Sequence, residues 1–178
     1  MVSKRCHKTQ TGFSLIEILI SLLILSIGLL GLGGLQLSSL KSANNAHFRT
    51  VASLAATDLI DRMRINPLAV ANNYYTGSLS IQHCETALAK VCEAANECSA
   101  EDLAKYDLYR VNCGVSAGNH QTGGVQHDLP QAELSVGCTV PPCRTGAEHT
   151  IRVSWNETDG DDEDDDVQAR SYELSFIP

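Results

Sequence analysis

The chain has 178 residues, of which 43% are hydrophobic and 19% are charged, and its formal net charge at pH 7 is -8. This acidic balance argues against a nucleic-acid-binding protein, which should present a basic surface. A mean hydropathy of -0.08 argues against a membrane protein with many spans, and the length predicts one modest domain.

Both the charge and the hydrophobicity are unevenly distributed along the chain. Residues 157–166 hold eight acidic residues and no basic one, so the rest of the chain carries 13 acidic and 13 basic residues. Between Phe13 and Leu40 the only charged residue is Glu17, and Ile18 to Leu35 is an uncharged run of 18 residues. The acidic block and the apolar block therefore need separate explanations.

The apolar block predicts a helix that crosses a membrane. With its apolar flanks the run reaches the ~20 residues that a span requires, and a buried helix of a soluble domain is rarely apolar on every side. The basic residues Lys4, Arg5 and Lys8 precede it, which keeps the N-terminus in the cytoplasm by the positive-inside rule. The alternatives are a secretory signal peptide, for which only residues 43–46 approach a cleavage site, and a plain membrane anchor.

Glu17 is the informative residue of this block. A carboxylate inside a membrane helix is costly unless it is paired, so a plain anchor leaves Glu17 unexplained. Cleavage after Gly12 would create a positive partner, the α-amino group of Phe13, four residues before Glu17 and on the same helical face. The two groups could then pair within one chain or between neighbouring chains.

The hexapeptide Gly12-Phe13-Ser14-Leu15-Ile16-Glu17 follows a short basic leader and precedes an apolar helix. In this context it resembles the type III signal of type IV prepilins and of type II secretion pseudopilins. The resemblance implies that a prepilin peptidase removes residues 1–12 as a leader and methylates the new N-terminal Phe13. It also implies that Glu17 guides the docking of each subunit into a growing filament.

Residues 41–66 predict an amphipathic continuation of the same helix. Neither Gly nor Pro occurs there, and apolar residues recur at steps of three and four, namely Phe48, Ala52, Ala55, Leu59 and Met63. Asp58 with Arg62 and Asp61 with Arg64 add charge pairs at helical spacing. Pro67 is expected to end the helix, because the residue before a proline is pushed out of the helical region.

The remaining residues, 67–178, predict a small head. Residues 72–77 and 114–130 are expected to be loops, with a capped helix from about Ala100 to Asn112 and a weaker helical stripe from Leu88 to Ala95. Period-two alternation predicts three antiparallel strands around 134–140, 151–155 and 172–176, packed by one face on the long helix. The expected fold class is α+β, a pilin-like ladle with a hydrophobic helix at 13–40, its amphipathic continuation at 41–66 and an antiparallel β-sheet head.

Seven cysteines occur, and Cys6 lies in the leader. The other six, in a segment exported to an oxidising compartment, predict up to three disulfides. The candidates are Cys84, Cys92, Cys98, Cys113, Cys138 and Cys143. Their spacing leaves the pairing open, although Cys138 with Cys143 could close a tight turn and two of the first three could staple the helical region. A zinc site is the competing interpretation, but only Cys138 and Cys143 have knuckle spacing.

The acidic block lies between two predicted strands, so it is expected to be a solvated hairpin loop. Calcium binding is the alternative, because carboxylates are hard oxygen ligands, although the ligand spacing of an EF-hand is missing. The candidate calcium ligands are Asp159, Asp161, Asp162, Asp164 and Asp166. Apart from this possible calcium ion, no cofactor is expected.

No catalytic residue is predicted. Residues 114–118 satisfy the G-x-S-x-G pattern of hydrolases, but the segment after them is expected to be a loop, and the head is too small for the α/β sheet which that chemistry requires. Phosphate loops, dinucleotide fingerprints and H-E-x-x-H motifs do not occur.

Short motifs of the head, residues 102–108, 129–130 and 151–155, resemble PilV-type minor pilins in particular. The resemblance implies a non-catalytic minor pilin of the priming and tip complex that initiates type IV pilus assembly and supports twitching or adhesion. Its implied partners are other minor pilins, the major pilin, prepilin peptidase, the inner-membrane assembly platform and, as an alternative, a large tip adhesin. The implied location is the bacterial inner membrane, with a periplasmic head, and later the pilus. A minor pseudopilin of type II secretion and an adhesive tip subunit are the rival functions.

Overall fold

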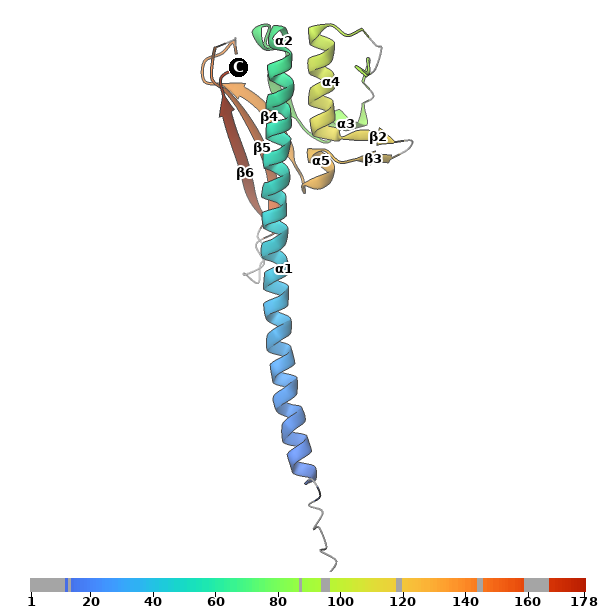
Figure 1. Ribbon diagram of the computed structural model, residues 1–178, viewed down its shortest axis with the longest axis vertical. Coiled ribbons are helices and arrows are strands. Elements are labelled where there is room, and N and C mark those ends of the chain that lie inside the picture. The colour runs from blue at the N-terminus through green and yellow to red at the C-terminus, as the bar shows by residue number, and fades with distance from the viewer. Residues whose placement is uncertain are drawn as a thin grey trace, which may run out of the picture. The chain divides into compact units, whose positions relative to one another are not determined.

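The structure is a computed structural model that describes Gly12 and residues 14–86, 88–93, 97–117, 120–143, 146–158 and 167–178. The chain divides into two compact units, Met1–Ser42 and Ala43–Pro178. An α+β, pilin-like architecture is confirmed: a long N-terminal helix is followed by a small antiparallel sheet (Figure 1).

Helix α1 spans Leu15–Ile65, a length of 51 residues. It ends where the sequence predicts, because Asn66 has φ -123° and ψ 60° and Pro67 opens the short helix α2 (Pro67–Ala71). The predicted amphipathic face is buried at Ala52, Leu59 and Met63. The predicted ion pairs also form, with 3.0 Å between Arg62 and Asp58 and 3.3 Å between Arg64 and Asp61.

The main sheet has four antiparallel strands in the order β1-β4-β5-β6. They are β1 (Gly77–Leu79), β4 (Glu133–Cys138), β5 (His149–Thr158) and β6 (Val167–Phe176). In register, Ile151 of β5 lies between Val136 of β4 and Leu174 of β6. Alternate residues of β4 and β5 are therefore buried, as period-two patterns require.

The predicted three-strand sheet lacked one strand, because residues 77–79 form the edge strand β1, whereas Gly77 was expected in a loop and residues 78–79 were assigned to no element. Gly77 pairs with Val136 and Leu79 pairs with Leu134. A three-residue segment that begins with glycine has too little periodicity to be recognised locally. Its extended conformation comes from the hydrogen bonds that it makes with β4.

Helix α4 (Ala100–Cys113) agrees with the predicted helix and begins at the predicted capping box. The Ser99 hydroxyl accepts a hydrogen bond from the Asp102 backbone N–H at 3.1 Å, and the Asp102 carboxylate accepts one from the Ser99 backbone N–H at 3.2 Å. A short helix, α3 (Gln82–Glu85), precedes it. The predicted stripe from Leu88 was wrong for the part that the structure describes, since residues 88–93 are not helical.

The predicted loop after α4 contains regular structure, which corrects that expectation. Strands β2 (Val115–Ala117) and β3 (His120–Thr122) form a two-stranded antiparallel ribbon, followed by the short helix α5 (Val125–Asp128). Gly114 precedes the ribbon and Gly124 follows it, with φ of 78° and 83°. Turn-forming glycines suggested a loop, but here they allow the chain to enter and leave a hairpin.

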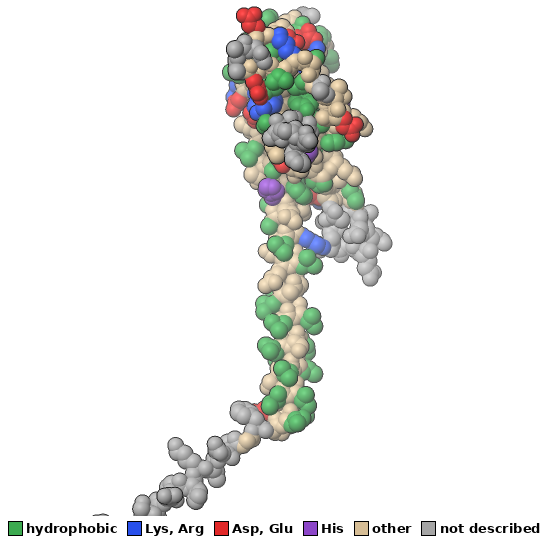
Figure 2. Space-filling model, turned by 90° about the vertical axis from the view of Figure 1, so that its right-hand side faces the viewer, with side chains coloured by type: hydrophobic (Ala, Val, Ile, Leu, Met, Phe, Trp, Pro, Cys, Tyr) green, Lys and Arg blue, Asp and Glu red, His purple; other side chains and the backbone are tan. Residues whose placement is uncertain are grey.

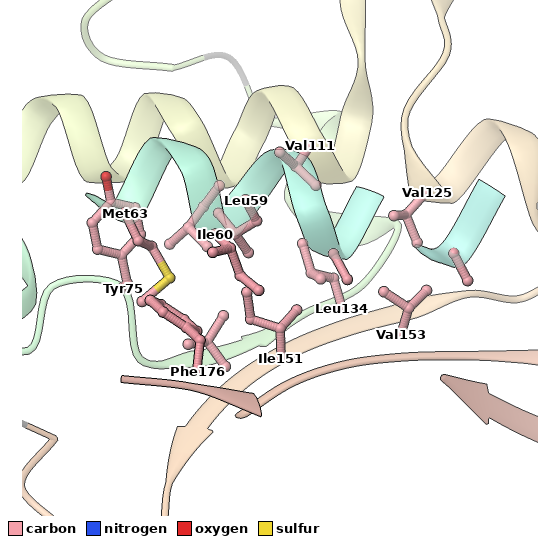
Figure 3. Close-up of a cluster of buried hydrophobic side chains, with 14 of the residues drawn as sticks. Leu59, Ile60, Met63, Tyr75, Val111, Val125, Leu134, Ile151, Val153 and Phe176 are labelled. Carbon is pink, nitrogen blue, oxygen red and sulfur yellow. The ribbon is translucent and has the colours of Figure 1, made fainter. Parts of the chain in front are cut away.

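The core of the Ala43–Pro178 unit lies where α1 packs on the sheet. Figure 3 shows Leu59, Ile60 and Met63 of α1 facing strands that carry Ile151 and Val153. All five side chains are at most 5% exposed. Val111 of α4 and Val125 of α5 join the same hydrophobic cluster. The second half of α1 is therefore a structural part of the head.

Candidate processing and assembly site

The predicted processing site lies at the start of α1. Gly12 is exposed and precedes the helix, whereas Phe13 and residues 1–11 lie outside the described residues. The Ser14 carbonyl accepts a hydrogen bond from the Glu17 backbone N–H at 3.0 Å, so the first helical turn closes directly after the Gly12–Phe13 bond. The predicted cleavage site, after Gly12, is therefore only a few residues before the start of α1 at Leu15.

Glu17 lies in the first turn of α1, where its negative charge is stabilised by the exposed N–H groups of the helix terminus. Its side chain is exposed and makes no ion pair with any residue of the described chain. The Glu17 carboxylate can therefore accept a cation from outside its own helix. The predicted partner of Glu17, the amine of Phe13, lies outside the described residues.

The helix surface of the Met1–Ser42 unit is apolar on every side. Leu15, Leu30 and Leu35 are between 70% and 78% exposed, and the leucines and isoleucines between them have no neighbouring side chains that cover them. Figure 2 shows hydrophobic side chains along this part of the helix. By length and composition α1 can cross a membrane, and the apolar window is not buried in the chain. This surface needs lipid or other helices to cover it.

Three disulfides join the six candidate cysteines from Cys84 to Cys143, which confirms the prediction of disulfide bonds. The pairs are Cys84–Cys113, Cys92–Cys98 and Cys138–Cys143. The first ties α3 to the end of α4, and the other two close short loops. The pairing of Cys84 with Cys113 could not be read from spacing, because 29 residues separate them.

A buried polar network connects α1 to α4. The Arg62 guanidinium lies 3.1 Å from the carboxylate of Asp107, whose side chain is only 4% exposed. The Tyr75 hydroxyl donates a hydrogen bond to the same carboxylate at 2.7 Å, and the Asn66 amide donates one to the Tyr75 oxygen at 3.3 Å. Burial, together with the hydrogen bond to Asp107, raises the pKa of Tyr75 well above its usual range.

Sequence reasoning did not identify this network, although one signal was present. Asp107 lies four residues from both Leu103 and Val111, so it occupies the apolar stripe of the predicted helix. A charged residue in such a stripe indicates a buried partner. The partner itself, Arg62, was assigned only to Asp58, which it also binds.

The remaining candidate sites are not assembled within the described residues. The candidate calcium ligands, Asp159, Asp161, Asp162, Asp164 and Asp166, all lie outside them, between β5 and β6. In the part of the chain that the structure describes, no group of three metal-ligating side chains comes together. Ser116 of the hydrolase-like pattern lies in β2, a strand of the small ribbon, and not on a strand-to-helix turn.

Two family models match the chain. The prokaryotic N-terminal methylation motif matches residues 7–33, and type IV pilin Tt1218 matches residues 34–109. The first match contains Gly12, Phe13 and Glu17, and the second continues from it along α1 and through most of α4. Comparisons with curated proteins and with solved structures gave no match.

Proposed function

The chain is a type IV prepilin-like protein, and on this premise we propose that it is a minor pilin of the type IV pilus. In this proposal residues 1–12 are a cleaved leader, 13–40 a membrane and filament-core helix, 41–66 its amphipathic continuation and 67–178 a periplasmic head. The protein is held in the bacterial inner membrane with a cytoplasmic N-terminus until it enters the pilus. Its work there is non-catalytic: with other minor pilins it starts the filament and remains at the tip.

The observation that carries this proposal is the exposed Glu17 in the first turn of an otherwise apolar helix. An isolated carboxylate in a membrane is unfavourable, so Glu17 favours a state in which a cation lies beside it. The methylated amine of Phe13 on a neighbouring pilin supplies that cation after prepilin peptidase has acted. Assembly then brings the two charges together while the apolar surfaces cover one another.

The processing step is tested by determining the N-terminus of the mature protein by mass spectrometry. We expect an N-methylated Phe13, and a mature chain that begins elsewhere would refute the proposal. Removal of residues 1–12 also removes three basic residues, so the mature chain becomes more acidic than its precursor.

The assembly step is tested with Glu17→Gln, which keeps the size of the side chain and removes its charge. We expect normal cleavage but at least tenfold less protein in sheared pili, because the carboxylate no longer attracts the neighbouring amine. Asp61→Asn is the matched control, since it also exchanges a carboxylate for the amide of the same size, and Asp61 is exposed on the same helix and within the described residues pairs only with Arg64. Wild-type incorporation of the Glu17 variant would refute the assigned role.

A minor pseudopilin of type II secretion shares the N-terminal signal and is the second candidate. Deletion of the gene separates the two functions, because loss of surface pili and twitching with intact protein secretion supports the pilus. The reverse result would assign the chain to secretion. An adhesive role of the head is compatible with either system and would be measured as binding of piliated cells to a surface.

A further inference from the structure

A groove on the Ala43–Pro178 unit is lined by residues of α1, α4 and α5. Its volume is about 280 Å³, and its lining includes Leu54 and Asp58 of α1, Val111 of α4, and Val125 and Asp128 of α5. We call it the α1–α5 groove. All of its lining residues belong to the Ala43–Pro178 unit.

The groove combines an apolar wall with two carboxylates, Asp58 and Asp128, and one guanidinium, that of Arg110, which already binds Glu93 at 2.9 Å. Val111 and Val125 are buried, whereas Leu54 is 65% exposed. Asp58 already binds Arg62 at 3.0 Å, but the Asp128 side chain makes no ion pair with any residue that the structure describes. A long side chain with an apolar stem and a cationic end fits this combination, as arginine does.

Arg49 of the same helix has the complementary chemistry. It is exposed and makes no ion pair within the described chain. Nine residues, or 2.5 helical turns, separate it from Asp58, so the two side chains leave α1 on opposite faces. Arg49 therefore cannot enter the α1–α5 groove of its own chain. A contact between these two different surfaces is heterologous, and it can be repeated from copy to copy without closing a ring.

We propose that the α1–α5 groove binds Arg49 of a second copy of this chain. The Arg49 stem lies against Leu54, and its guanidinium binds Asp128 and the outer side of Asp58. The two α1 helices run parallel and are displaced along their axes by at most about 13 Å, the rise of nine residues. This inference depends on the proposed function because insertion in one membrane is what holds the helices parallel.

Cysteine cross-linking of the full-length chain tests the contact. Copies carrying Arg49→Cys and copies carrying Leu54→Cys are expressed together in membranes, and disulfide-linked dimers are measured after mild oxidation. The native cysteines beyond the leader are already joined in pairs. We expect at least tenfold more dimer than with Thr57→Cys in place of Leu54→Cys, because Thr57 is exposed on α1 outside the groove lining. Equal yields would overturn the proposal.

Charge exchange tests the electrostatic part in the purified full-length chain in neutral detergent micelles. Arg49→Glu and Asp128→Lys should each raise the dissociation constant of the dimer about tenfold, as measured by sedimentation, and the double variant should recover most of the loss. Asp61→Lys makes the same charge change outside the groove and should have little effect. Absence of recovery, or an equal effect of Asp61→Lys, would overturn the proposal.

The two proposals fail separately. If dimers form through the groove but the Glu17→Gln variant enters pili normally, the assembly role of Glu17 is refuted and the groove contact stands. If Glu17→Gln blocks incorporation and neither the cross-link nor the charge exchange behaves as expected, the groove proposal is refuted and the pilin function stands.

Discussion

Replacement of Asp107 by alanine should destabilise the head more than any other removal of a charged group described above. Asp107 is 4% exposed at its side chain and receives hydrogen bonds from Arg62 and from Tyr75. Alanine leaves both donors without their acceptor and opens a space between α1 and α4. Removal of one member of a buried ion pair typically costs 3–5 kcal/mol.

The lower end of that range applies here, because the Arg62 side chain is 28% exposed and keeps its contact with Asp58. Water can therefore solvate part of the guanidinium in the variant. The Tyr75 hydroxyl is buried and retains only its bond from Asn66. We expect a loss of about 3 kcal/mol in the free energy of unfolding, or roughly a 150-fold change in the unfolding equilibrium.

The assay is urea unfolding of the mature chain in detergent, followed by the fluorescence of Trp155. This residue is the only tryptophan of the chain, and it is 2% exposed in the head, so its emission reports unfolding of the head. Asp61→Ala is the control, because it breaks an ion pair whose side chains are 65% and 59% exposed, and it should cost less than about 1 kcal/mol. A loss below about 1 kcal/mol for Asp107→Ala would refute the assigned weight of the network.

Three further predictions concern single residues of the head. The pKa of Tyr75 is raised in the folded head, so the neutral hydroxyl stabilises the fold fully below the unfolded pKa of about 10. This stabilisation is lost as the pH rises further. Tyr75→Phe should therefore flatten the alkaline part of a plot of unfolding free energy against pH. Gly114→Ala should prevent native folding, because a Cβ at this position, where φ is 78°, would collide with the carbonyl oxygens of Thr122 and Gly123. The measurement is the yield of correctly disulfide-bonded protein. Gly137→Ala is the control and should be tolerated, because its Cβ would meet no atom within 4 Å. Ser99→Ala should lower the melting temperature of the head by the loss of about 1 kcal/mol, since the Asp102 backbone N–H loses its cap, and an unchanged melting temperature would contradict this role.

The sequence predicted those parts of the fold that repeat over many residues. The long helix, the capped helix at Ala100 and the three long strands all carry a periodic pattern or a local capping signal. Strand β1 and the ribbon after Gly114 carry none, because three residues are too few for a period and their pairing partners are set by the tertiary fold. For the same reason Cys84 could not be assigned to Cys113 in advance, nor Asp107 to Arg62: each pair meets only after α1, α3 and α4 have packed.

The functional residues also differ in whether the local sequence alone can indicate them. The prediction for Gly12, Phe13 and Glu17 depends on a six-residue motif, which can be recognised in the sequence without knowledge of the fold and lies in the segment that matches the N-terminal methylation motif. The α1–α5 groove could not be found like this, since it is built from three helices distant in the chain. Its two carboxylates come from Asp58 of α1 and Asp128 of α5, which meet only in the folded chain.

The apolar helix and the charged groups have different consequences for assembly. Sixteen leucines and isoleucines between Leu15 and Leu40 are each more than half exposed, and covering each is worth on the order of 1 kcal/mol once the helix has left lipid for a filament surrounded by water. That sum exceeds any single ion pair, so in the proposed filament the apolar surface would supply most of the stabilisation. It is similar on all sides, however, and therefore favours no single rotation or axial displacement of one helix against the next. In the proposed assembly a charge would fix both, because Glu17 would be stabilised only beside the Phe13 amine of a neighbouring chain. The proposed contact between Arg49 and the α1–α5 groove would fix the axial displacement a second time, in the head.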